Sequence, residues 1–146
     1  MMERILKVQL DAVLANQGLA RAIAAAYVSE LDPTVEEITE IKTAVSEAFS
    51  NAAIHGYPGN TGGTAVMEMA TLNDRTIMIK ICDYGVGIEN IAQAMEPLFT
   101  THEGDECSGM GFTVMESFTD KIKVDSRPGE GTAVTMIKKL DTYYEL

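Results

Sequence analysis

Apolar residues change their spacing several times along this chain, and each change predicts a change of secondary structure. Residues 4–10 alternate between apolar and polar side chains, and residues 75–82 place isoleucine at every second position. Such alternation is typical of strands with one buried face. Residues 33–55 instead carry apolar side chains at three- and four-residue steps, which is the repeat of an amphipathic helix. A chain with both repeats is expected to pack helices against a sheet.

The order of these segments predicts an α+β fold. Asp32 could cap the second helix, with Pro33 in its first turn, and Gly56 would end it. Strands that cluster in antiparallel pairs, with helices covering one face, predict a two-layer α/β sandwich with a mixed, mostly antiparallel sheet. The predicted strands are residues 4–10, 64–72, 75–82, 121–126 and 131–138, and the predicted helices are residues 15–31, 33–55, 90–95 and 109–119.

Length and charge limit the classes of function. The chain has 146 residues, 22 of them acidic and 11 basic, and a net charge of −11. A chain of this length can bury a core without disulfides or a structural metal, so one domain over residues 1–146 is expected. The negative charge disfavours direct binding of nucleic acid. It is compatible with docking to a basic protein surface, although a solvated acidic exterior is the commoner explanation.

Cysteine content and hydropathy indicate where such a chain would work. Cys82 and Cys107 match no zinc spacing and no disulfide framework. The N-terminus has no apolar core of the kind found in signal peptides. The longest apolar run, residues 22–28, is far shorter than the ~20 residues that a membrane span needs. A cytoplasmic protein with reduced thiols is therefore expected.

One polar face of the second predicted helix could carry chemistry. Glu47, Asn51 and His55 are four residues apart, so they share a face. A carboxylate beside a carboxamide can accept a proton and hold magnesium, which takes oxygen ligands and keeps several waters. A solvated helix face has the same spacing, so this pattern alone does not establish a site.

Glycines mark two further segments. Asp83 follows a predicted strand and precedes Gly85 and Gly87. Its carboxylate could accept a hydrogen bond from an amino group such as that of adenine, while the glycines allow a ligand to approach. Gly109 and Gly111 open a predicted helix, whose free amides could bind a phosphate. Each segment alone is also explained by an ordinary turn.

The polar residues that precede the last helix form the fourth segment. Thr100 and Thr101 follow Phe99, and their hydroxyls could bond phosphate or ribose oxygens. A plain loop around a buried Phe99 explains the same residues.

In this order, the four segments resemble the GHKL ATPase/kinase superfamily, which includes gyrase, MutL and the histidine kinases. They correspond to its N box, first glycine box, Phe-Thr-Thr segment and second glycine box. Gyrase and MutL carry further domains, and histidine kinases carry a dimerisation helix, which 146 residues would not hold. Longer stretches, including residues 31–34, 46–48, 51–57, 97–101 and 108–112, resemble the anti-sigma F factors of sporulating bacteria, which are compact serine kinases.

The resemblance implies a role for each matching residue. Glu47 would be the catalytic base toward a substrate serine, and Asn51 would bind the magnesium ion. Asp83 would contact adenine. Arg21, on the first helix, would meet partner proteins, although an ordinary surface arginine fits equally. The cofactors implied are ATP or ADP and Mg²⁺, and the residues implied to bind them are Asn51, Asp83, Gly85, Gly87, Thr100, Thr101, Ser108, Gly109, Met110, Gly111 and Phe112.

The resemblance also implies two activities and their partners. The chain would form a homodimer that binds and inhibits a sporulation sigma factor, and it would phosphorylate an anti-anti-sigma protein on serine. The N-terminal strand is the candidate dimer edge, because an edge strand offers unpaired backbone groups.

Residues 102–107 depart from the pattern of this family. They form an acidic lid segment where related lids carry basic residues, so they should neutralise less phosphate charge. This departure favours a nucleotide-dependent binding module without kinase activity. The motifs are also compatible with a stress-response kinase of the anti-sigma B type and with an ATPase fragment of a larger machine.

Overall fold

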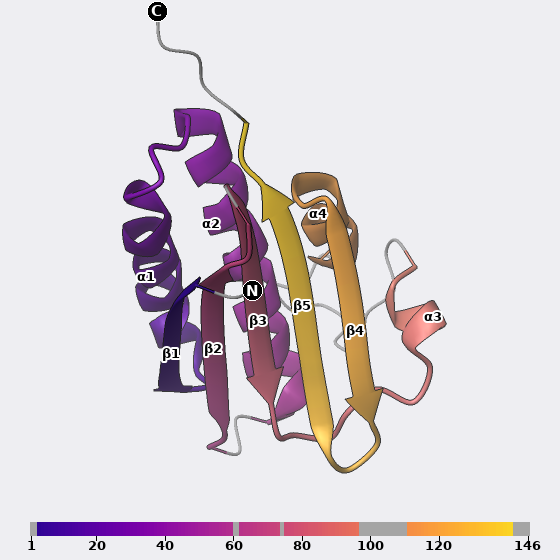
Figure 1. Cartoon of the computed structure of the whole chain (residues 1–146). Coiled ribbons are helices and arrows are strands. Elements are labelled where there is room, and N and C mark those ends of the chain that lie inside the picture. Colours follow the sequence, from indigo (N-terminus) through magenta and orange to yellow (C-terminus); the bar gives the residue numbers. More distant parts are fainter. Residues whose placement is uncertain (1–2, 60–61, 74, 97–110, 142–146) are drawn as a thin grey trace, which may run out of the picture.

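The computed structural model describes residues 3–59, 62–73, 75–96 and 111–141. Five strands form one sheet in the order β1-β2-β3-β5-β4, and α1, α2 and α4 cover one of its faces (Figure 1). This arrangement confirms the predicted two-layer α+β sandwich. All four strand pairings are antiparallel, so the described strands contain no parallel pair of the kind that a mixed sheet would have. The strands are β1 (Glu3–Asp11), β2 (Thr64–Thr71), β3 (Thr76–Asp83), β4 (Lys121–Arg127) and β5 (Gly131–Lys139).

The helices lie close to their predicted ranges. A 3₁₀ turn, η1 (Leu14–Asn16), leads into α1, and α2 continues into a π-helical turn, η2. The π turn ends at Gly56, which agrees with the predicted end of the second helix. The helices are α1 (Gln17–Ser29), α2 (Val35–Asn51), η2 (Ala52–Gly56), α3 (Ile91–Ala94) and α4 (Gly111–Phe118).

The prediction that Asp32 caps the second helix is wrong. Asp32 has a φ of 49° and ends the turn after α1, whereas Thr34 has the extended backbone of an N-cap residue. The Thr34 hydroxyl accepts from the amide of Glu37 at 3.1 Å, and the Glu37 carboxylate accepts from the amide of Thr34 at 2.8 Å. This reciprocal pair is a capping box, and its Thr-x-x-Glu signature was present in the sequence.

The core lies between α2 and the covered face of the sheet. Ile77, Ile79 and Ile81 are almost completely buried, as the alternation in β3 predicts. Ile41 and Phe49 of α2 are buried with them. The packing of α2 over β3 brings the end of this helix close to the end of the strand, where the pocket described below lies. In the part of the chain that the structure describes, no helix combines the length and hydropathy needed to span a bilayer.

Candidate functional site

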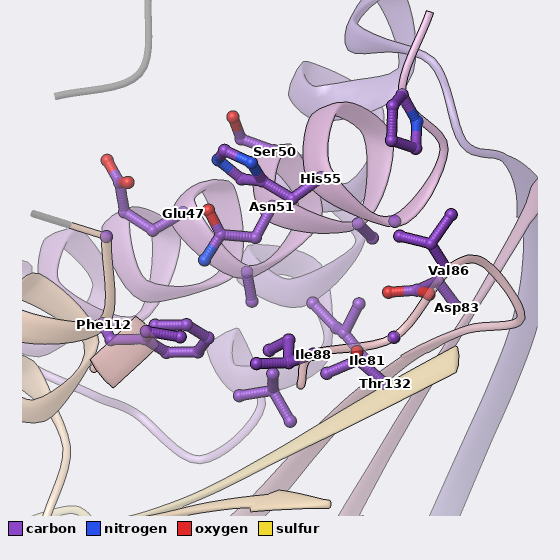
Figure 2. A pocket seen from close by; sticks show the side chains of 18 of the residues that line it. Glu47, Ser50, Asn51, His55, Ile81, Asp83, Val86, Ile88, Phe112 and Thr132 are labelled. Atoms are coloured by element: carbon purple, nitrogen blue, oxygen red, sulfur yellow. The ribbon is translucent and has the colours of Figure 1, made fainter. Parts of the chain in front are cut away.

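A pocket of about 670 Å³ lies among the end of α2, the loop after β3 and the start of α4. Its volume is typical of a site for a small molecule. Figure 2 shows Glu47, Asn51 and Phe112 toward one end of the pocket, and Asp83 and Val86 toward the other. The pocket lining includes six of the residues predicted for the site, namely Glu47, Asn51, Asp83, Gly87, Gly111 and Phe112.

The first end of the pocket combines acidic and amide side chains with the start of a helix. A Cβ atom at Gly111 would lie 3.2 Å from both Oδ1 and Nδ2 of Asn51, and 3.3 Å from Oε2 of Glu47. The backbone at the start of α4 therefore lies directly beside these two side chains. Burial raises the pKa of the Glu47 carboxyl above its ordinary value. This end of the pocket offers a proton acceptor, a neutral oxygen ligand and free helix amides.

The second end is built around Asp83, the last residue of β3. Its side chain is buried, and Oδ1 accepts a hydrogen bond from the amide of Gly85 at 3.0 Å. Burial raises the pKa of this carboxyl, and hydrogen bonds from the amides of Gly85 and Thr132 partly oppose that effect. A buried carboxylate with free acceptor capacity can bind an amino group of a ligand.

Gly85 and Gly87 allow the loop after β3 to approach its neighbours. A Cβ atom at Gly85 would lie 1.8 Å from the carbonyl oxygen of Gly56, so no larger residue fits there without backbone movement. Gly87 has a φ of +74°, in the left-handed region that favours glycine. Gly87 lines the pocket, whereas Gly85 supports it from the side of the π turn.

Arg21 does not line the pocket. Its guanidinium donates to the hydroxyl of Ser46 at 3.1 Å, and Ser46 directly precedes Glu47 in α2. The predictions for Thr100, Thr101, Ser108, Gly109, Met110 and the lid at residues 102–107 lie outside the described residues.

Thr132 is a pocket residue that the sequence motifs did not indicate. It lines the pocket at the start of β5 and pairs with Asp83 across β3 and β5. Its hydroxyl lies 2.7 Å from that of Ser126 on β4. Alternation within β5 could have placed Thr132 on the covered face of the sheet. Only the pairing of β5 with β3 puts it beside Asp83.

The two ends of the pocket differ in the ligand groups that they suit. Ile81 and Ile88 line the pocket and are labelled between the two ends in Figure 2. Among the described residues, no three His, Cys, Asp or Glu side chains gather into a metal-binding group. The arrangement suits a ligand with an amino group at one end, a flat apolar body and anionic groups at the other.

Comparison with known proteins identifies the class to which this fold and site belong. The chain matches the model of the histidine kinase-like ATPase domain over residues 10–138, and it belongs to that family. The solved RsbU and RsbW domains of a Mycobacterium tuberculosis protein align with a TM-score of 0.67 and 22% identity, over 94% of this chain and 32% of that longer chain. The mycobacterial sensor histidine kinase MprB aligns with a TM-score of 0.58 and 16% identity, over 92% and 98% of the two chains.

Those structures share the fold, and more similar sequences narrow the class. The chain is 51% identical to an anti-sigma F factor of Clostridium acetobutylicum, over 95% of this chain and 96% of that protein. It is 48% identical to an anti-sigma F factor of Bacillus licheniformis, over 95% and 94%. Within the ATPase family, the chain therefore belongs to the anti-sigma F factors.

Proposed function

We propose that this chain is an ATP-dependent serine kinase and an anti-sigma factor, which binds and inhibits a sporulation sigma factor and phosphorylates the anti-anti-sigma protein that opposes it. One observation carries the proposal. The pocket places Glu47 and Asn51 beside the start of α4, and Asp83 at its other end, in a chain about half identical to anti-sigma F factors. We assign the activity to a single domain over residues 1–146, acting in the cytoplasm.

The polarity of the pocket sets the direction in which ATP would bind. Asp83 would accept a hydrogen bond from the amino group of adenine, because its carboxylate lines the pocket where β3 ends. The triphosphate would lie toward the start of α4, where free amides and the helix dipole favour negative charge. The absence of a side chain at Gly111 would leave room for this approach.

Asn51 fits the role of a magnesium ligand. Its Oδ1 lies at the same end of the pocket as the start of α4, where the phosphates would bind. A bound Mg²⁺ would offset charge on the transferring phosphoryl group, using one side-chain oxygen together with phosphate oxygens and water.

Glu47 fits the role of the general base. It would accept the proton of the substrate serine hydroxyl, whose oxygen bonds to the γ-phosphorus as the bond to the β-phosphate oxygen breaks and ADP leaves. A base works best when its pKa is close to the working pH, and burial raises the pKa of Glu47 in that direction. Correct placement of the serine and the phosphates would supply most of the remaining rate enhancement.

We assign partner binding to α1 and dimerisation to β1. Arg21 is the candidate partner contact, and its bond to Ser46 would connect α1 with the segment of α2 that carries Glu47. β1 is an edge strand that pairs with β2 alone in the described sheet, so two copies could pair along its other side.

Phosphate transfer from labelled ATP tests the kinase assignment. Wild-type protein, Mg²⁺ and γ-labelled ATP should place label on a serine of the anti-anti-sigma protein, and Glu47→Ala should abolish the label while ATP binding is kept. Sigma factor should co-purify with the ATP-bound protein. Nucleotide-dependent capture of sigma without any label would support the non-catalytic binding module instead. Label that persists in Glu47→Ala would show that Glu47 is not the base.

A further inference from the structure

Tyr57 does not line the pocket, although Gly56 and Pro58 on either side of it do. Its partly buried ring packs against the hydrophobic core. The hydroxyl donates to the carbonyl of Thr64 at 2.7 Å and accepts from the amide of Tyr84, also at 2.7 Å. One side chain thus joins the end of the π turn to the start of β2 and to the loop after β3.

Gly63 provides the surface on which the Tyr57 ring lies. A Cβ atom at residue 63 would lie 2.1–2.3 Å from three carbons of the ring, so glycine is required beneath it. The carbonyl of Gly63 also accepts from the amide of Ala12 at 2.9 Å, which ties this segment to the chain just after β1. The ring is therefore held between the core and an anchored backbone segment.

Tyr57 and Tyr84, which one of these hydrogen bonds joins, each lie next in the chain to a residue of a close contact in the pocket wall. A Cβ atom at Gly56 would lie 2.7 Å from Cγ of Asp83 and 2.9 Å from each carboxylate oxygen. Tyr57 follows Gly56 in the chain, and Tyr84 follows Asp83. Two hydrogen bonds therefore hold Gly56 beside the Asp83 carboxylate: the Tyr84 amide donates to the Tyr57 hydroxyl, and the Val86 amide donates to the carbonyl of Gly56 at 2.9 Å.

We infer that Tyr57 is a positioning residue, which orients the Asp83 carboxylate and thereby makes the pocket select a purine with a 6-amino group. This inference rests on the proposed binding of ATP. A carboxylate accepts a hydrogen bond from the amino group of adenine, whereas hypoxanthine presents a carbonyl oxygen at the same position. A site built to bond one group rejects the analogue that lacks it, provided that its polar atoms are held in place.

Titration calorimetry with ATP and with inosine triphosphate, both with Mg²⁺, tests this role. In Tyr57→Phe the ring stays but both bonds of the hydroxyl are lost. The preference for ATP over inosine triphosphate should fall about fivefold to tenfold, because loss of a well-placed hydrogen bond has an effect of this size. The affinity for inosine triphosphate should stay within about twofold, because the triphosphate is held at the other end of the pocket.

Tyr27→Phe is the matched control. The Tyr27 hydroxyl also bridges two groups, since it donates to the carbonyl of Arg4 at 2.7 Å and lies 3.0 Å from the hydroxyl of Thr71. It lies outside the pocket lining, so its loss should lower stability without changing the preference between the two nucleotides. Gly63→Ala displaces the Tyr57 ring by a second route and should lower the preference as Tyr57→Phe does.

The possible failures can be told apart. If wild-type protein prefers ATP and Tyr57→Phe keeps that preference, or weakens both nucleotides equally, Tyr57 only supports the fold and the inference is wrong. If wild-type protein binds both nucleotides equally, Asp83 does not select the base, and the inference about Tyr57 is wrong for that reason. If it binds neither, the proposed function itself is wrong.

Discussion

Glu47 illustrates how burial adapts one carboxyl group to its proposed task. It lies near the end of α2, beside the start of α4, and desolvation there raises its pKa from an ordinary 4.5. A carboxylate with a raised pKa is a stronger base, yet it is lost earlier when the solution is acidified. The rate of phosphate transfer should therefore depend on pH through this residue.

We expect the rate of wild-type phosphate transfer to fall as the pH decreases through the raised pKa of Glu47, at a pH above 4.5. Glu47→Gln cannot accept the proton, so its rate should be about 10²- to 10⁴-fold lower, and the decrease of the rate at acidic pH should disappear. The measurement is the single-turnover rate at saturating ATP from pH 5 to 8. Glu36→Gln, in the first turn of the same helix, is the control. It should keep both the wild-type rate and its decrease at acidic pH. If Glu47→Gln keeps the same decrease at acidic pH, another group causes the pH dependence.

At the scale of elements, a buried carboxylate joins the start of α2 to the segment just after β5. Glu37 accepts from the amide of Thr34 through one oxygen and from the amide of Asp141, at 2.7 Å, through the other. Burial alone would raise its pKa, but these hydrogen bonds and the nearby Arg75 guanidinium together lower it. The lowered pKa means that the folded state favours the ionised form.

We expect Glu37→Gln to lower the free energy of unfolding at pH 7 by about 1–2 kcal/mol, since glutamine offers one acceptor oxygen to the two amides. The stabilisation belongs to the ionised carboxylate. The stabilisation should be complete well above the ordinary pKa of 4.5 and disappear as the pH falls through the lower pKa of the folded state. Urea unfolding of both proteins at pH 7 and pH 3.5 measures the difference. Glu36→Gln is again the control. If the difference in free energy of unfolding between wild type and Glu37→Gln grows on acidification, this account is wrong.

At the scale of the whole molecule, the sheet has two edges and one face covered by helices (Figure 1). β1 forms one edge, and its pairing with β2 shifts register between Glu3 and Leu6. Ile5 lies within this shift and is 63% exposed, although isoleucine is among the residue types most often buried. We therefore use Ile5 to test the proposed dimer.

We expect Ile5→Lys to weaken the proposed dimer about tenfold or more, because a charge at the edge opposes strand pairing and loses apolar contact. Sedimentation at several protein concentrations measures the change. Val35→Lys is the matched control, because Val35 is 82% exposed at the start of α2. If both variants sediment like the wild type, β1 is not the dimer edge.

Much of this fold and one half of the site could be predicted from residues that are close together in the sequence. Local repeats predict the burial of the isoleucines of β3 and of the apolar stripe of α2, because each repeat follows from the geometry of a single strand or helix. Glu47 and Asn51 share a face for the same reason. The predicted start of α2 was too early, because Pro33 is typical of a first helical turn whereas the Thr34–Glu37 capping box begins this helix at Val35.

The rest depended on pairings between distant segments, for which no local repeat exists. Thr132 meets Asp83 only because β5 pairs with β3 in one register, and Gly111 meets Asn51 only because α4 packs beside α2. The role inferred for Tyr57 has the same origin, since its hydroxyl joins residues 64 and 84 across the end of the sheet. Residue types and local spacing thus indicated the elements and the class of site. Packing and strand register decided which groups meet, because those contacts depend on the closure of the whole core.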